Sequence, residues 1–339
     1  MIDWGAGYVA SWRLMEVDPE TWADTTEITD VDSITVERGD EQLVESGTAE
    51  VTLDVGTDFG ERWCRVEMLA EQDGEHERVA IATMLFAPSS ISTSHLRDVA
   101  TVEGRSVLAP AADEAMLAGS YVPKGADGAA EAARLIRSCT PAPVVVDGIF
   151  RLVQEMVFAQ GTTKVEAAWM LLDAANWCMQ IDGDGTIHIR PKPTEPTLEL
   201  DHAHASLIAT EVTTESSLWT VPNRYIAIDN GDMAIATNSD PADPTSYQSR
   251  GRWVDEVDTS PTRIDGESLQ GYAERMLAER HASLCSKIYT REWWPDVTVS
   301  SLVRGGLSSV GLVGDMRVTS QSLTCGAGVS ITETAEVIS

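Results

Sequence analysis

The clearest pattern of hydrophobic and polar positions spans residues 162–193, TTKVEAAWMLLDAANWCMQIDGDGTIHIRPKP. Apolar residues first recur at steps of three and four, which predicts an amphipathic helix that begins at a capping box of Thr163 and Glu166. Apolar and polar positions then alternate on both sides of residues 183–185, which predicts two strands joined by a tight turn. None of the patterned residues resembles a nucleophile or a general base, so the segment indicates packing and assembly rather than catalysis.

Residues 1–107 show the alternation that is typical of strands. Alternating segments occur at residues 33–37, 49–55, 63–69, 78–86 and 99–105, and a polar turn at residues 71–75 joins the third to the fourth. Strands at this spacing, with turn residues between them, predict a small β-barrel or sandwich.

Residues 108–195 have a different composition, with more alanine and a helical period. The pattern predicts a helix that starts near Asp127 and stops before Pro141 and Pro143, and then a short strand at residues 144–146. The helix and hairpin of residues 162–193 follow. We therefore expect a mixed α+β domain here.

Residues 196–339 return to strands. Candidates lie at residues 209–216, 224–228, 233–237, 297–302, 315–323 and 329–336, and Asp229-Asn230-Gly231-Asp232 is a strong hairpin turn. One further helix is predicted at residues 268–286. Its apolar face comprises Leu269, Ala273, Met276, Leu277 and Leu284.

The charge balance restricts the possible partners. Acidic residues outnumber basic ones by 54 to 24, a formal net charge of −30, and this surface repels phosphate backbones. Two interpretations remain open: an adaptation to high salt, which screens self-repulsion, or an acidic wall along which DNA passes without being held. The scarcity of lysine also follows from a GC-rich genome.

Membrane and disulfide signals are weak. The sequence predicts no transmembrane helix and no signal peptide, so we expect no stable membrane insertion. The five cysteines are scattered and form no CxxC pair, which predicts free thiols.

Two segments resemble metal sites. Residues 182–185, DGDG, resemble the start of a calcium loop, but the later ligands are missing, and a hairpin turn explains them better. His202 and His204, beside Asp201, are a candidate chelating pair, and a solvated linker is the alternative. No nucleotide-binding or hydrolase motif occurs. We expect no catalytic residue, no cofactor and no metal.

Ten tryptophans against four phenylalanines is an unusual ratio. Trp219, Trp253, Trp293 and Trp294 are candidates for an exposed aromatic platform that binds sugar or protein. Because tryptophan is a common anchor at interfaces, we favour protein contact over sugar stacking.

The order of the segments carries a family resemblance. DVDSITVERGDEQLVESGTAEVTLDV, SVLAPAADEAMLAGSYVPKGADGAAEAARLI, the helix and hairpin, VPNRYIAI, ESLQGYAERMLAER and GLVGDMRVTSQSLTCGAGVSITETAEV follow one another. Together they resemble the baseplate or tail hub proteins of tailed viruses, which are related to hub parts of contractile injection systems. The acidic, lysine-poor composition fits a virus of a halophilic archaeon, and a GC-rich bacterial host fits too.

The resemblance implies a β-rich α+β fold with two tube-type β-barrel domains, residues 1–107 and 196–339, and an inserted α+β domain at 108–195. It implies a homotrimer that adapts a six-fold tail tube to a three-fold tip and lines the channel for genome ejection. The implied partners are the distal tail or tail tube ring, the tape-measure protein, tail tip or fibre proteins, and DNA that passes without specific binding. The implied location is the virion tail or baseplate, after assembly in the host cytoplasm.

Two other functions remain open. One is a tail protein that binds or hydrolyses envelope glycans, and hydrolysis would require a cleft with two carboxylates, one of raised pKa. The other is an injection-system adaptor of cellular origin. We expect that the chain is not an enzyme.

Overall fold

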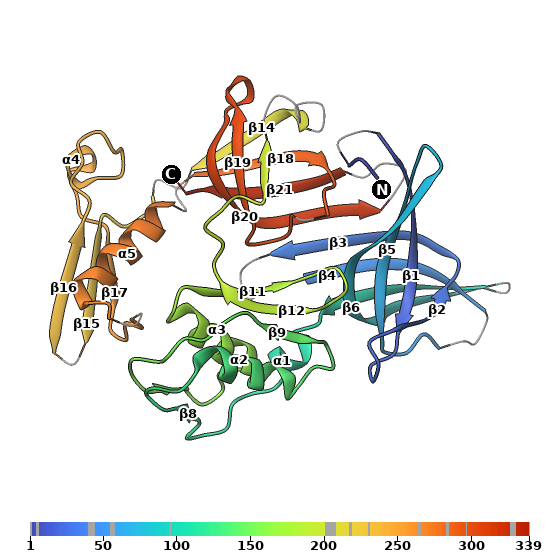
Figure 1. The fold of residues 1–339 in the computed structure, drawn as a ribbon, viewed down its shortest axis with the longest axis horizontal. Coiled ribbons are helices and arrows are strands. Elements are labelled where there is room, and N and C mark those ends of the chain that lie inside the picture. The colour runs from blue at the N-terminus through green and yellow to red at the C-terminus, as the bar shows by residue number, and fades with distance from the viewer. Residues whose placement is uncertain are drawn as a thin grey trace.

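The computed structural model of the protein describes residues 2–4, 7–39, 45–54, 58–94, 97–200, 208–216, 219–229, 231–263, 266–282, 285–295, 297–325 and 330–338. Long antiparallel strands dominate, with five α-helices among these residues. The N-terminal and C-terminal strands lie side by side, the helices of the middle part lie along one side, and a small sheet with its own helix stands apart (Figure 1). The predicted β-rich α+β class is confirmed.

Seven strands form the N-terminal part: five of them, from residue 31 onward, contain the predicted alternating segments, and two earlier ones were not predicted. The polar turn at residues 71–75 joins two of them through Asp73 and Gly74, both at positive φ (51° and 85°), the geometry of a tight hairpin turn. The strands are β1 (Val9–Val17), β2 (Asp24–Ile28), β3 (Val31–Gly39), β4 (Glu45–Leu53), β5 (Arg62–Gln72), β6 (Glu75–Thr93) and β7 (Asp98–Ser106).

The middle part contains the predicted helix and hairpin. Thr163 caps the helix and Glu166 completes the capping box, as the sequence predicts. The elements are α1 (Ala109–Asp113), β8 (Tyr121–Val122), α2 (Gly128–Arg137), β9 (Val144–Val146), β10 (Met156–Val157), α3 (Lys164–Asp173), β11 (Trp177–Ile181) and β12 (Ile187–Pro191). Helix α2 begins after Asp127, whose carboxylate accepts from two backbone amides.

The C-terminal part returns to strands around one helix. Its elements are β13 (Leu198–Leu200), β14 (Ile208–Ser216), β15 (Arg224–Asp229), β16 (Asp232–Thr237), α4 (Tyr247–Arg250), β17 (Asp255–Asp258), α5 (Leu269–Ala282), β18 (Cys285–Glu292), β19 (Leu302–Leu307), the short 3₁₀ helix η3 (Ser308–Val310), β20 (Leu312–Cys325) and β21 (Ser330–Val337).

Two sequence predictions in this part are wrong. The helix predicted at residues 268–286 ends at Ala282, and Cys285 already belongs to β18, because pairing with β14 and β21 outweighs the helical pattern. The strand predicted at residues 297–302 is a turn segment, and β19 begins only at Leu302. Leu284, Asn230 and Val329, which the predictions also used, lie outside the described residues.

The two ends of the chain repeat one strand order. In what we call the N-terminal unit the order is β3-β4-β7-β6-β5, and in the C-terminal unit it is β14-β18-β21-β20-β19. The strands correspond one to one in chain order, and both units skip one residue at the same place, between Pro88 and Ser90 and between Val318 and Ser320. The units are therefore two versions of one topology.

The two units form one sheet rather than two separate barrels. Strand β3 pairs with β20, so the sheet runs from β14 through both units to β2, and its two ends stay open within the described residues. The described residues form four apolar cores, and the one under the N-terminal strands also includes Leu323 of β20 and Ile331 of β21. Representative members are Leu14, Val66 and Phe86; Ala132, Leu171 and Ile187; Val303, Met316 and Val318; and Tyr225 and Ala273.

Candidate functional site

A chain of buried polar side chains crosses the seam where β3 meets β20. Arg38 of β3 donates to Glu45 of β4 (Nε–Oε1 2.8 Å) and to Gln321 of β20 (Nη1–Oε1 3.4 Å). Gln321 donates onward to Glu333 of β21 (Nε2–Oε1 2.7 Å). Glu333 accepts two hydrogen bonds, of 2.8 and 2.7 Å, from Arg291 of β18. The polar chain therefore ties strands of both units together.

Burial makes this polar chain depend on complete pairing. The side chains of Arg291 and Glu333 are 2% and 0% exposed. Burial by itself lowers the pKa of Arg291, but the adjacent Glu333 carboxylate raises it above its ordinary value. Burial also raises the pKa of Glu45, and the Arg38 guanidinium opposes that rise. Because an unpaired buried charge is costly, loss of either partner destabilises the fold more than the pair itself stabilises it.

The turn of the β11–β12 hairpin docks on the N-terminal sheet. Thr83 of β6 donates to the Gly183 carbonyl (2.9 Å), and Arg65 of β5 donates to the Asp184 carbonyl (3.1 Å). Gly183 has no room for a side chain, because a Cβ there would lie 1.9 Å from the Ala80 carbonyl oxygen. The predicted hairpin turn is thus confirmed, and its carbonyl oxygens serve to dock the middle part on the sheet.

The other metal candidate is not described. Asp201, His202 and His204 lie outside the described residues. Within the described part of the chain, no three His, Cys, Asp or Glu side chains are grouped so that they can hold a metal ion. No helix there is both long and apolar enough to span a bilayer.

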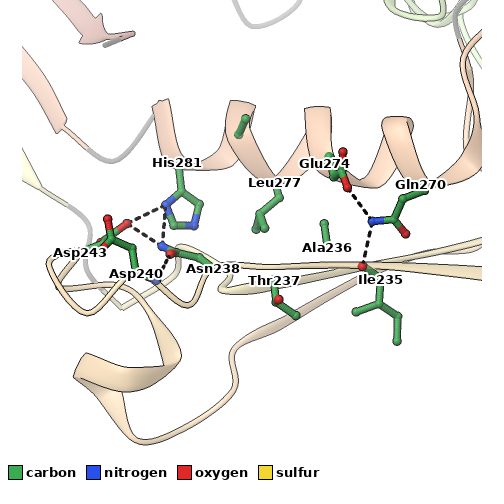
Figure 2. A pocket seen from close by; sticks show the side chains of 11 residues that line it. Ile235, Ala236, Thr237, Asn238, Asp240, Asp243, Gln270, Glu274, Leu277 and His281 are labelled. Atoms are coloured by element: carbon green, nitrogen blue, oxygen red, sulfur yellow. Dashed lines mark hydrogen bonds and ion pairs between the residues drawn. The ribbon is translucent and has the colours of Figure 1, made fainter.

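A cleft of about 530 Å³ lies between β16 and α5 (Figure 2). Ala236 and Leu277 form its apolar floor, and Gln270 at one end donates to the Ile235 carbonyl (3.2 Å). At the other end His281 of α5 meets the loop that follows β16. Polar residues are the majority of the cleft lining, seven of eleven, and they flank this small apolar floor.

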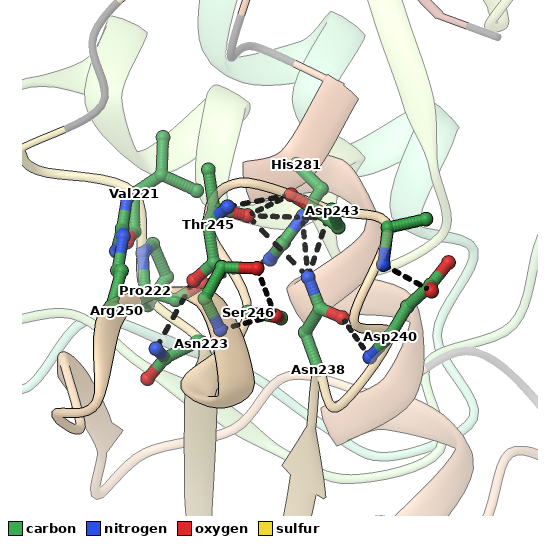
Figure 3. Close-up of polar contacts among 12 residues, drawn as sticks. Val221, Pro222, Asn223, Asn238, Asp240, Asp243, Thr245, Ser246, Arg250 and His281 are labelled. Atoms are coloured by element: carbon green, nitrogen blue, oxygen red, sulfur yellow. Dashed lines mark hydrogen bonds and ion pairs between the residues drawn. The ribbon is translucent and has the colours of Figure 1, made fainter.

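The polar end of the cleft fastens this loop to α5 (Figure 3). His281 Nε2 donates to the Pro222 carbonyl (2.9 Å), and its Nδ1 lies 3.3 Å from Asp243 Oδ2. The Thr245 hydroxyl and amide both donate to Asp243 (2.7 Å each), and Asn238 donates to it as well (2.6 Å). Burial raises the pKa of Asp243, but these hydrogen bonds and His281 outweigh burial and hold that pKa below its ordinary value.

These side chains do not form a catalytic triad, although the residue types are those of one. In a triad the two imidazole nitrogens face the acid and the nucleophile separately. Here Asp243 and Thr245 both lie at Nδ1, while a backbone carbonyl occupies Nε2. Thr245 is also fully buried. The arrangement therefore fixes a loop and offers no activated nucleophile.

The carboxylates do not favour glycan hydrolysis either. Among the carboxyl groups of the described residues whose pKa is shifted, only that of Glu45 is raised, and Glu45 is buried at the seam beside Arg38. A glycosidase needs the raised group in a cleft that admits substrate.

The four candidate tryptophans do not share a surface. Trp293 is buried beside Trp4, with ring centroids 5.3 Å apart, and Trp294 packs against the C-terminal core. Trp219 is 81% exposed with Arg252 over its ring, and Trp253 stacks on Tyr247. The platform is thus divided: two tryptophans strengthen cores, and two lie on the small module of residues 219–282.

Sequence reasoning missed the polar chain at the seam. The sequence signal was a charged residue at an inward-facing position of an alternating strand. Glu333 lies between the buried Ile331 and Ala335, and Arg291 lies two residues after the buried Tyr289. Such residues are rarely buried unless they are paired, so each one predicts an inward partner.

Comparison with known proteins relates the fold to viral tails. No family model matches the chain, and no curated protein matches it in sequence. The 43 kDa tail protein of prophage MuSo2 from Shewanella oneidensis matches with a TM-score of 0.70 at 15% identity, over 97% of this chain and 98% of that one. The tail protein from Neisseria meningitidis MC58 matches with a TM-score of 0.70 at 14% identity, over 98% and 97%.

A more distant match is an Escherichia coli component of the type VI secretion system, which is described as structurally similar to T4 bacteriophage tail proteins gp27 and gp5. Its TM-score is 0.53 at 8% identity, over 91% of this chain and 74% of that one. These structural neighbours are tail or secretion-system components. The chain has the fold of prophage tail proteins over nearly its whole length.

Proposed function

We propose that this chain is a structural protein of a viral tail, the hub of its baseplate or tip, and has no enzymatic role. The observation that carries the proposal is the likeness of its fold to prophage tail proteins, which spans both chains almost from end to end. The cleft at α5 supports the same conclusion, because its polar groups bind one another.

The hub acts as a homotrimer that joins a six-fold tail tube to a three-fold tip. The repeated strand order supports this proposal, since three copies with two equivalent units each present six similar units in one ring. In this proposal residues 1–107 and 196–339 are the tube-type domains, whose sheets close only in the ring, and residues 108–195 are the inserted domain.

The ring encloses a channel for genome ejection, and its wall is acidic. Residues 1–107 hold 23 acidic and 7 basic side chains, residues 196–339 hold 20 and 10, and residues 108–195 hold only 11 and 7. The excess of carboxylates thus lies in the two sheet-forming regions. Since lysine and arginine bind phosphates, a wall with few of them lets DNA pass without specific binding.

The partners that follow from this role are the distal tail or tail tube ring above, the tape-measure protein in the channel, and tail tip or fibre proteins below. The protein is located in the virion tail, after assembly in the host cytoplasm. The acidic composition matches a halophilic host, and the salt response described below tests that origin.

Native mass spectrometry of the full chain, with electron-microscopy class averages of the same sample, tests the proposal. We expect a species of three times 36.7 kDa that averages to a ring with a central opening. A stable monomer across the micromolar range, or turnover of an envelope glycan that a single carboxylate substitution abolishes, contradicts it.

A further inference from the structure

The small sheet of the module has two apolar faces, and α5 covers one of them. Successive side chains along a strand point to opposite faces. On β15 and β16 one set of side chains is buried against α5: Tyr225, Ala227, Ala234 and Ala236. The other set points away from α5, as Ile235 does in Figure 2. Together with one residue of β17 this set forms what we call the outer face: Ile226, Ile228, Met233, Ile235 and Val257.

The strand register brings the residues of the outer face together. Ile226 lies between Ile235 of β16 and Val257 of β17. Ile228 faces Met233 in the next pair along the same strands. Met233 is 62% exposed, Val257 55% and Ile235 40%. The outer face is therefore one contiguous apolar patch, and such patches mark interaction sites, unlike single exposed apolar residues.

Aromatic side chains continue the outer face at one end. Arg224 of β15 donates to Asp255 of β17 (Nε–Oδ1 2.8 Å), and its guanidinium carbon lies 4.7 Å from the centre of the Trp253 ring. Trp253 stacks on Tyr247 with ring centroids 4.3 Å apart. An apolar centre beside half-exposed aromatic rings and a paired arginine is the composition of a protein interface.

The sequence of these strands also indicates a second cover. Residues 225–228, YIAI, and 233–236, MAIA, are apolar at every position. Strands with one solvated face alternate with polar residues, whereas continuous apolar runs are typical of strands that are covered on both faces. Within the described chain α5 supplies one cover, and the exposure of Met233 and Val257 leaves the other to a second molecule.

Charge favours a second copy of this chain as that molecule. Arg224 and Asp255 pair with each other, so the strand residues of the outer face carry no net charge, although the whole chain carries −30. Two such chains repel each other wherever carboxylates meet, and a neutral apolar face is a surface on which they can associate. A basic partner would be attracted instead to the acidic surface elsewhere on the chain.

The position of the module indicates which part of the second copy it meets. The module buries a core of its own and stands at the end of the molecule, beyond the C-terminal unit and away from the N-terminal unit (Figure 1). In a head-to-tail ring the C-terminal unit of one copy lies beside the N-terminal unit of the next. The module then lies at this junction.

We propose that the outer face of the module packs on the N-terminal half, residues 1–195, of the next copy in the ring. The inference rests on the proposed function, because the ring of three supplies the neighbour. The contact is head-to-tail, so the outer face of one copy meets a different surface of the next. Each module thereby fastens two copies together outside the sheets that line the channel.

Photocrosslinking from the outer face tests the contact. In the full-length chain p-benzoylphenylalanine replaces Met233, whose exposure allows the exchange without disturbing the core. The sample is irradiated, the band of twice the chain mass is isolated on a denaturing gel, and mass spectrometry identifies the joined peptides. We expect them to join position 233 to residues 1–195 of a second copy.

The matched control carries the same photoreactive residue in place of Glu274, which is exposed on α5, on the other side of the small sheet. It should give at least about tenfold less of the doubled band, because only a docked face holds the reactive group at a high effective concentration near the neighbour. Equal yields from both positions overturn the inference. So do crosslinks that join position 233 only to the module or the C-terminal unit of the second copy.

A charge placed in the outer face gives an independent measurement. Val257→Asp should weaken assembly by at least about tenfold, because the contact would bury a carboxylate without a partner. Val257→Thr, of similar shape and without charge, is the control and should assemble nearly as the wild type does. Mass photometry measures assembly, and circular dichroism checks that both variants fold. A folded Val257→Asp chain that assembles as tightly as the wild type overturns the inference.

Native mass spectrometry of the wild-type chain separates the two proposals. An oligomer without the expected crosslinks refutes the contact, assigns the outer face to another protein, and leaves the hub function standing. A monomer without crosslinks refutes both.

Discussion

The N-terminal and C-terminal units share a strand order and a bulge, yet they fill equivalent positions with opposite chemistry. The register places Ala100 where the C-terminal unit has Glu333, and Leu53 where it has Arg291. One unit thus has an apolar pair at a place where the other buries an ion pair. Strand order and alternation therefore define this sheet, whereas the side chains that are buried at equivalent positions can be apolar in one unit and charged in the other.

The units also differ in what covers them. The docked hairpin buries Thr83 of β6 completely, whereas Val313, at the same place in β20, is 52% exposed. The C-terminal unit in turn carries the module of residues 219–282 between its first two strands, where the N-terminal unit has the short connection 40–44. Additions to one topology therefore distinguish the units.

The largest effect is expected at the buried ion pair. Glu333→Ala leaves Arg291 buried without its partner and should lower the free energy of unfolding by about 3–5 kcal/mol. Urea denaturation measures the change.

The double variant Arg291→Leu with Glu333→Ala is the control, because it copies the residues of the N-terminal unit. It should recover part of the loss, because it removes the guanidinium that the single variant leaves buried without a partner. A double variant as unstable as the single one would show that the apolar residues of the N-terminal unit cannot replace the ion pair of the C-terminal unit.

A second effect is expected at the hairpin that covers only the N-terminal unit. Gly183→Ala forces a methyl group onto the Ala80 carbonyl and should cost about 1–3 kcal/mol through overpacking. Thermal unfolding measures the loss. Gly7→Ala is the matched control, because a Cβ there meets no atom within 4 Å. Equal effects at both glycines indicate that the hairpin does not dock on the sheet.

Salt should act unequally on the two units. Raising KCl from about 0.15 M to about 1 M shortens the screening length from about 8 to 3 Å, and we expect on the order of 1–2 kcal/mol of added stability for a chain of charge −30.

Hydrogen exchange resolves where this gain falls. Because residues 1–107 have the larger acidic excess, protection should rise more in β4 and β7 than in β18 and β21. Lower stability in KCl contradicts the high-salt interpretation.

The smallest effect concerns Asp243, whose contacts with Thr245 and His281 fasten the loop after β16 to α5. The pKa of Asp243 lies below its ordinary value of 3.8, so its contribution is present above about pH 4 and is lost as the pH falls through the lowered pKa. Amide exchange at Thr245, measured between neutral pH and pH 3, should report a local opening.

Asp243→Asn should cause the same opening at neutral pH, at a cost of about 1 kcal/mol. Asp240→Asn is the control, since Asp240 accepts mainly from the nearby Ala242 amide (2.9 Å). Unchanged exchange in Asp243→Asn shows that the Asp243 carboxylate does not hold the loop.

Local patterns predicted the local elements well. The capping box of Thr163 and Glu166, the turn at Asp73 and Gly74, and the hairpin around Gly183 all appear where the sequence places them, because each depends on neighbours within a few residues. The predicted end of the last helix, at residue 286, is wrong because it depends on distant residues: the segment that follows Ala282 pairs with β21.

The sequence by itself determined the alternation of strands and helices, the acidic surface and the likeness of the segment order to tail hubs. Only the tertiary structure decided that β3 meets β20 and that Arg38, Gln321, Glu333 and Arg291 join across that seam. The physical reason is range. Periodicity and capping act within one or two turns of chain, whereas strand pairing and buried charge compensation join residues hundreds of positions apart.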